Sequence, residues 1–194
     1  RLILEIVVNP LLQKRVIERL APRTLASLDA SRPGEPTRWA LFGASFETPP
    51  DYEIRRQRLH LGDLALDLHA PRGRRLLVRQ VYPATIALSR RTIQKWLDVT
   101  EFKEHRIFRP EGDPAPWSLH VGEKDLTGFV HEGRKTLAAP LGFVSPRQTA
   151  RAILRDEALD RLLIARADAP PGAFNNRSVV EQALRAMNWT VPDE

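Results

Sequence analysis

The sequence predicts an α+β domain, mainly an antiparallel β-sheet flanked by α-helices, with an N-terminal helical arm before it. Two observations carry this prediction. Between residues 46 and 82, apolar and polar side chains alternate through short segments separated by turn residues, as in antiparallel strands with one solvated face. Most strand-like segments also precede the helix-like ones, an order that is typical of α+β folds and not of parallel sheets.

The first 36 residues are predicted to form a separate arm. Residues 2–8 (LILEIVV) are apolar and β-branched, which fits a short buried strand or the end of an upstream helix. An Asn-Pro pair then has the residue types of a helix N-cap and first helical position, and apolar residues follow at helical spacing. The Pro- and Gly-containing loop 29–37 separates this arm from a main domain that spans residues 37–194.

The main domain is predicted to begin with strands at residues 39–47, 52–59, 62–68 and 75–82. The third strand shows the alternation clearly, since Leu64, Leu66 and Leu68 share one face while Asp63 and Asp67 share the other. The Ala-Pro-Arg-Gly segment before the fourth strand has Pro and Gly at the positions that a type I turn favours.

Helices and shorter strands are predicted for the rest of the chain. Helices are expected over residues 84–97 and 146–158, and a last helix opens on the capping box Ser-Val-Val-Glu at residues 178–181. Short strands are expected in a loop-rich region, around residues 106–108, 117–121 and 127–131. The apolar segment RLLIARA at residues 161–167 predicts a late strand.

Composition bounds the classes of function. The chain of 194 residues is 42% hydrophobic and carries a net charge of +6, with 25 Arg among its 30 basic residues. Such a bias suits a phosphate-rich or acidic partner, although a GC-rich genome produces it as well. The absence of cysteine excludes disulfides, thiolate metal sites and cysteine nucleophiles. No apolar run is long enough to span a membrane, so we expect a cytoplasmic protein. A start at Arg1 rather than Met leaves room for an upstream segment.

The most concentrated functional groups of this sequence are the positively charged arginine side chains. Alternation places Arg56 and Arg58 on one side of their strand, and Arg75 and Arg79 on one side of theirs. If these groups share a surface, they form a stripe for phosphate or acidic-peptide contacts. The candidate partner-binding residues are therefore Arg55, Arg56, Arg58, Arg75, Arg79, Arg90, Arg91 and Trp117, the last in a Pro-rich loop. In the alternative interpretation, the arginines are neutralised in ordinary cross-strand charge pairs with Glu47, Glu53, Asp63 and Asp67.

The motifs that would indicate catalysis or metal binding are absent. Asp67 and His69 project from one face of a strand, but four converging ligands would require residues from elsewhere, so no metal site is predicted. His105, His120 and His131 form an acid–base site only if the fold gathers them. No phosphate-loop spacing and no nucleophile elbow occur. We therefore predict no catalytic residue and no cofactor.

Residues 46–54, FETPPDYEI, resemble the F-x-x-P-x-x-W/Y-x-aliphatic opening of the Mog/PsbP-like group. That group includes the photosystem II extrinsic protein P and Ran-binding Mog relatives. The resemblance extends as a pattern over residues 39–189 and implies a small antiparallel-sheet domain with flanking helices. It also implies binding of partners without catalysis, and it assigns no role to individual residues.

These observations favour a non-enzymatic protein-interaction module, an accessory subunit of a larger assembly. It would dock a protein partner through its arginine-bearing sheet face and its N-terminal arm. One alternative is a nucleic-acid-binding domain that contacts phosphates through the same arginines. A second alternative is a hydrolase-like enzyme with a His/Glu site in the region 102–131.

Overall fold

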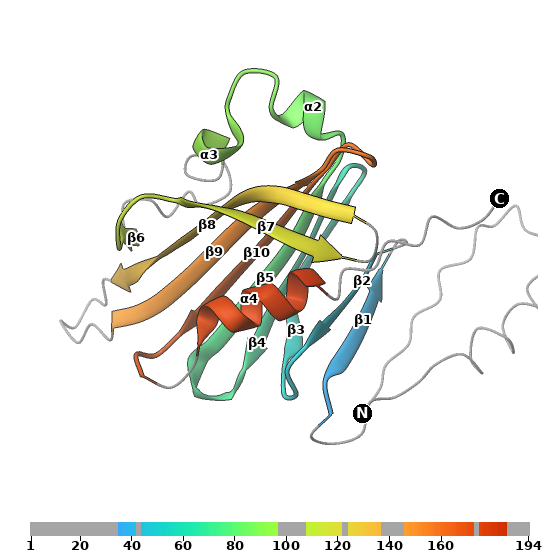
Figure 1. Ribbon diagram of the computed structural model, residues 1–194. Helices are drawn as coiled ribbons and strands as arrows, with labels where there is room; N and C mark the ends of the chain where they lie inside the picture. The colour runs from blue at the N-terminus through green and yellow to red at the C-terminus, as the bar shows by residue number, and fades with distance from the viewer. Residues whose placement is uncertain are drawn as a thin grey trace, which may run out of the picture. The chain divides into compact units, whose positions relative to one another are not determined.

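The computed structural model describes residues 35–41, 44–96, 108–121, 124–136, 146–172 and 175–185. Within these residues the fold is a mainly antiparallel β-sheet with three short helices, which confirms the predicted mainly antiparallel architecture (Figure 1). The predicted N-terminal arm lies almost wholly outside the described residues, so the boundary at residue 36 stays a prediction.

The main sheet contains eight of the described strands. Its order is β3 (Glu53–His60), β4 (Asp63–Ala70), β5 (Arg74–Val81), β10 (Arg161–Ala169), β9 (Pro146–Asp156), β8 (Lys124–Thr136) and β6 (Phe108–Pro110). The eighth strand, β7 (Ala115–Val121), pairs with another stretch of the same edge of β8, so the sheet is seven strands wide. Every pairing is antiparallel. The predicted strand 39–47 is instead a separate hairpin of β1 (Thr37–Leu41) and β2 (Ala44–Thr48).

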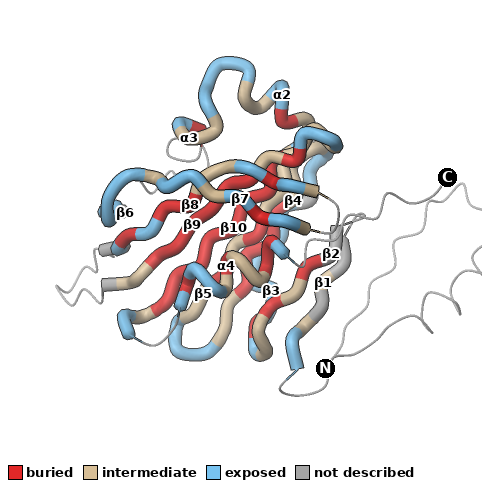
Figure 2. The backbone as a smooth tube through the Cα atoms, in the orientation of Figure 1, coloured by how far each residue is buried: buried red, intermediate tan, exposed pale blue. Residues whose placement is uncertain are grey.

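One face of the sheet carries the larger part of the core, and we call it the apolar face. Helix α4 (Asn176–Arg185) packs on it against β9 and β10 and also contacts β2 (Figure 1). Figure 2 shows buried residues continuing along β9 and β10 beneath this helix. Each fully buried aliphatic side chain contributes about 1.5–3 kcal/mol through the hydrophobic effect. The core residues on this face include Leu66, Leu68, Leu76, Val78, Leu154, Leu163, Val180 and Leu184.

The opposite face, which we call the charged face, is apolar over part of its area only. There a second cluster packs beneath α2 (Ala84–Ala87) and α3 (Ile93–Trp96), and it consists of Ala84, Trp96, Ile153, Leu162 and Ile164. The prediction of one continuous helix over 84–97 is wrong. A polar turn separates the two helices, and the Thr92 hydroxyl accepts a hydrogen bond from the Lys95 N–H at 3.3 Å. Ser and Thr favour such local bonds over a helix interior, which explains the break.

The largest difference between the structure and the sequence prediction is at β9, because residues 146–158 were expected to form a helix. Alanine and arginine have high helix propensity, and they dominate this segment. β9 nevertheless pairs with β8 on one side and with β10 on the other. Its alternation matches these neighbours, with Ala150, Ala152 and Leu154 on the apolar face and Arg151 and Ile153 on the charged face. Pairing on both sides thus overrides local propensity.

Two local predictions also differ from the structure. Arg72 lies in the left-handed region with φ 60° and ψ 27°, so the turn that precedes β5 is not of type I. Helix α4 begins before the predicted capping box, because the Asn175 side chain accepts the Ser178 N–H at 3.0 Å and so caps the helix. The side of this helix that carries Val180 and Leu184 is buried.

Candidate functional site

The strand register aligns polar residues in two neighbouring rows across the charged face. One row runs through Arg56, Asp67, Leu77, Arg166, Arg151 and His131. The other row runs through His69, Arg75, Asp168, Thr149 and Gly133. We call the polar residues from β4 to β8 in these rows the charged band. Most of them are buried, namely Asp67, His131, Thr149, Arg151, Arg166 and Asp168.

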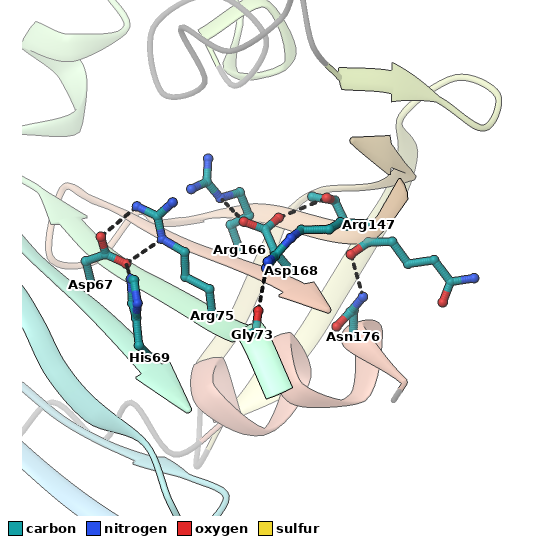
Figure 3. A network of polar contacts seen from close by, with 10 residues as sticks. Asp67, His69, Gly73, Arg75, Arg147, Arg166, Asp168 and Asn176 are labelled. Carbon is teal, nitrogen blue, oxygen red and sulfur yellow. Dashed lines mark hydrogen bonds and ion pairs between the residues drawn. The ribbon is translucent and has the colours of Figure 1, made fainter. Parts of the chain in front are cut away.

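Asp67 and Arg75 form a two-point ion pair within this band (Figure 3). Arg75 Nε and Nη2 donate to the two carboxylate oxygens at 2.8 and 2.6 Å. Burial by itself raises the pKa of Asp67. The hydrogen bond and charge of Arg75, together with the charges of His69 and Arg166, outweigh that effect and hold the pKa below its usual value. Asp67 is therefore ionised at neutral pH and neutralises Arg75.

Asp168 is the most deeply buried acid of the band, with 2% of its surface exposed. Its Oδ1 accepts a hydrogen bond from the Thr149 hydroxyl at 2.9 Å, and its Oδ2 lies 3.4 Å from Arg166 Nε. Such a pair adds little net stability, because the cost of removing both charges from water offsets their attraction. Removing one partner alone is costly.

His131 is held in a neutral form by its two neighbours. Arg151 Nη2 lies 2.7 Å from His131 Nδ1, and a guanidinium can only donate, so Nδ1 carries the lone pair. The other ring nitrogen, Nε2, then carries the proton and donates to the Gly112 carbonyl at 3.0 Å. Both ring nitrogens thus serve structural hydrogen bonds. This arrangement leaves neither of them directed at a substrate.

The described histidines of the predicted acid–base group do not meet. His120 pairs with Asp125 at 2.7 Å on the exposed surface of β7 and β8. Asp125 and His131 are six residues apart on β8, which corresponds to about 20 Å along an extended strand. His105 lies outside the described residues. No group of three or more potential metal-ligating residues occurs among the described residues.

The predicted arginines divide into two groups. Arg56, Arg58, Arg75 and Arg79 share the charged face, whereas the alternation had predicted a common side only within each strand. Arg79 donates from Nε and Nη2 to the Asp63 carboxylate at 2.6 and 3.0 Å, and Arg58 lies 3.3 Å from the same carboxylate. With the pair of Arg75 and Asp67, these contacts match the charge-pair interpretation. Arg75 and Arg79 therefore do not form an open phosphate surface together.

Arg55 and Arg56 form the second group. β3 is the terminal strand of the sheet, and residues 53–58 are all exposed. A bulge between Ile54 and Arg56 leaves Arg55 outside the regular pairing with β4. Within the described part of the chain, neither Arg55 nor Arg56 has a hydrogen bond or an ion pair. Their positive charge is therefore available at the sheet edge.

The other predicted contact residues lie elsewhere. Arg90 and Arg91 are exposed in the turn that joins α2 to α3. Trp117 was placed in an exposed loop by its Pro-rich surroundings. The structure places it on β7, half-buried against the core and opposite Gly128. Its ring is consequently part of the packing.

A pocket that no sequence pattern indicated lies at the end of the charged band. It has a volume of about 230 Å³ and is lined by His69, Gly73, Arg74, Arg75, Arg147 and Asp168. Arg147 belongs to β9 and reaches Gly73, the last residue of the turn η1 (Pro71–Gly73) before β5 (Figure 3). Because residues 146–158 were predicted to form a helix, the position of Arg147 beside Gly73 was not predicted. The alternation of Thr149, Arg151 and Ile153 was the signal that could have revealed it.

No protein-family model and no curated protein matches the sequence. Among solved structures, the fold is similar to a crystal structure from Bacteroides thetaiotaomicron VPI-5482, with 11% sequence identity and a TM-score of 0.44. The similarity covers 84% of this chain and 51% of the other, so this chain spans about half the length of that protein. The resemblance to the Mog/PsbP-like group stays a prediction. No described helix is long and apolar enough to cross a membrane.

The Asp67 pair predicts a pH-dependent contribution to stability. Because the folded state lowers the pKa of Asp67, its contribution is complete above the unfolded pKa of about 3.9 and is lost as the pH falls through the folded value. We expect Asp67→Asn to lower the free energy of unfolding at pH 7 by about 1–3 kcal/mol. The deficit should shrink below pH 4. Urea unfolding between pH 7 and pH 3 measures this change.

Asp125→Asn provides the matched control, because Asp125 forms an exposed pair with His120. Exposed pairs contribute little, so this variant should follow the wild-type curve within about 0.5 kcal/mol. A deficit of Asp67→Asn that stayed constant down to pH 3 would show that ionisation of Asp67 does not carry the effect.

Proposed function

We propose that this domain is a non-enzymatic protein-interaction module that binds an acidic, extended segment of a partner protein along the outer edge of β3. The observation that carries the proposal is the exposed edge strand, on which Arg55 and Arg56 have no hydrogen bond or ion pair within the described residues. An edge strand presents backbone N–H and C=O groups that can pair with a further strand. Binding would thus extend the sheet by one strand.

The side chains of β3 indicate which segment fits. On the charged face, Arg56 and Arg58 would lie beside alternate residues of the added strand, where carboxylates are complementary. On the apolar face, Ile54 is 42% exposed and offers an apolar contact. A segment that alternates acidic and apolar residues therefore matches both faces. Asp67 neutralises Arg75 and Asp63 neutralises Arg79, whereas Arg55 and Arg56 have no such partner among the described residues.

An accessory subunit of a larger assembly is a natural setting for such a module. The apolar residues 2–8 of the predicted N-terminal arm would add a second contact with the partner, although they lie outside the described residues. The proposal for β3 does not depend on that contact.

Fluorescence polarisation with a labelled peptide of alternating Glu and Val tests the proposal. We expect saturable binding that weakens with salt, and at least a tenfold loss of affinity for Arg56→Glu, because a favourable charge contact becomes a repulsive one. Arg109→Glu is the matched control. Arg109 is an exposed strand arginine on β6, and its reversal changes the net charge equally.

A second peptide separates strand addition from simple attraction of charges. N-methylation of alternate residues removes the N–H groups that would pair with β3 while leaving the carboxylates in place. Equal binding of both peptides, or an unchanged affinity of Arg56→Glu, would contradict docking on this edge. Binding of a single-stranded oligonucleotide that depends on Arg56, without peptide binding, would favour the nucleic-acid alternative instead.

A further inference from the structure

The pocket beside η1 has a distinctive charge. Three guanidinium groups and one imidazole line it, and Asp168 is its single carboxylate. The oxygens of Asp168 already contact the Thr149 hydroxyl and Arg166, at 2.9 and 3.4 Å. Three guanidinium groups against one carboxylate give the pocket lining an excess of positive charge. Such a lining attracts an anion.

The three arginines of the pocket differ in what neutralises them. Arg75 is paired with the buried Asp67, and Arg74 lies 3.8 Å from the exposed Asp51. In the described structure Arg147 contacts no carboxylate, and it donates to the Gly73 carbonyl instead. A carbonyl oxygen orients a guanidinium without cancelling its charge. Arg147 is therefore the side chain best prepared to receive an anionic group.

The position of Arg147 depends on a glycine. Gly73 has φ +71°, and a Cβ added there would lie 2.9 Å from Arg147 Nη2. A Cβ this close would push the guanidinium aside, so the glycine lets Arg147 keep its position. Arg74 is also held in place, since its Nε donates to the Pro71 carbonyl at 3.2 Å and its guanidinium lies 5.5 Å from the centre of the Tyr52 ring. Side chains ordered before binding lose less entropy when a ligand arrives.

We infer that this pocket binds the oxyanion group, a carboxylate or a phosphate, of a small molecule, with Arg147 as the main contact. A guanidinium fork matches both groups through two parallel hydrogen bonds. The volume of about 230 Å³ suits a small metabolite-sized ligand. This site is separate from the β3 edge and adds a small-molecule ligand to the proposed function.

Isothermal titration calorimetry with inorganic phosphate and with citrate, each against chloride at equal ionic strength, tests the inference. We expect saturable binding of at least one of them, and a loss of at least tenfold in affinity for Arg147→Met. The matched control Arg109→Met should bind like the wild type, because Arg109 lies on β6. The two titrations distinguish a phosphate site from a carboxylate site. No saturable binding of either anion, or wild-type binding by Arg147→Met, would overturn the inference.

Two further measurements keep the test independent of whether Arg147→Met folds. In the wild-type protein, the amide resonances of Gly73 and Arg74 should shift on titration while that of Gly112 stays unchanged. Gly73→Ala should weaken binding by displacing Arg147, whereas Gly112→Ala should not. Gly112 also has a positive φ, +90°, but a Cβ there meets no atom within 4 Å. Equal effects of the two glycine substitutions, or shifts confined to other regions, would exclude this pocket.

The variant Arg56→Glu separates this inference from the proposed function. It changes the β3 edge and leaves the pocket lining intact. We expect it to bind phosphate or citrate with wild-type affinity even where peptide binding is lost. Loss of anion binding in Arg56→Glu would place the anion at the β3 edge and would contradict the pocket.

Discussion

Replacing Gly128 by alanine is expected to destabilise the protein by about 3 kcal/mol or more, the upper range for overpacking a core. Gly128 lies on β8, between Trp117 of β7 and Leu154 of β9. A Cβ at this position would overlap the Ile153 carbonyl oxygen and would lie 3.0 Å from the Leu154 Cα. These are backbone atoms of a fully paired strand, so they cannot move aside as a flexible side chain does. Urea unfolding at pH 7 measures the loss.

Gly172→Ala is the control for Gly128→Ala. Gly172 has φ +79° in the turn after β10, and a Cβ there meets no atom within 4 Å. Its replacement should cost about 1 kcal/mol, from the unfavourable backbone conformation alone. The two substitutions add the same methyl group, so their difference reports the close approach of β8 to β9. Equal costs would contradict that approach.

Asp168→Asn is expected to lower the free energy of unfolding by about 3 kcal/mol, the cost of breaking a buried ion pair. Asparagine preserves the size of the side chain but removes its charge. Arg166, which is 6% exposed, then loses the carboxylate 3.4 Å from its Nε. Thr149 retains an oxygen to which its hydroxyl can donate. The charge of Asp168, rather than its hydrogen bond with Thr149, should therefore account for most of the effect.

A double-mutant cycle tests this assignment. We expect Arg166→Met to be destabilising by itself, whereas the double variant with Asp168→Asn should be more stable than the sum of both losses predicts, by more than 1 kcal/mol. Removing both charges avoids leaving Arg166 buried without the carboxylate that lies 3.4 Å from its Nε. Strictly additive losses would show that Arg166 and Asp168 do not depend on one another. Asp125→Asn again serves as the exposed control.

The strands on one side of the sheet could be predicted because their pattern is local. Alternation located β3, β4 and β5 within a few residues, and an apolar segment located β10. Alternation also placed Arg56 with Arg58, and Arg75 with Arg79, on one side of their own strands. Cross-strand charge pairs were predicted as one of two alternatives. Asp63 and Asp67 form them, because β4 and β5 are joined by a short turn that sets their register.

The candidate anion pocket could not be predicted, because its residues come from segments far apart in the sequence. Arg147 donates to Gly73 across 74 residues, and the contact exists only if residues 146–156 form a strand. Local composition favoured a helix there, since Ala and Arg are strong helix formers. The hydrogen bonds that β8 and β10 form with this segment decide its conformation, and neither neighbour is visible in the segment itself.

The amino-acid sequence by itself determined the class of fold, the alternation of the strands around residues 46–82, the excess of arginine and the absence of cysteine. These properties depend on composition or on residues close together in the chain. Only the tertiary structure decided which arginines are neutralised, which remain exposed on β3 and which line a pocket. The physical reason is that a charged side chain pairs with the polar or oppositely charged group that the fold places beside it. In this sheet, that partner comes from the preceding strand of a hairpin for Arg75 and Arg79, and from a segment 74 residues away for Arg147.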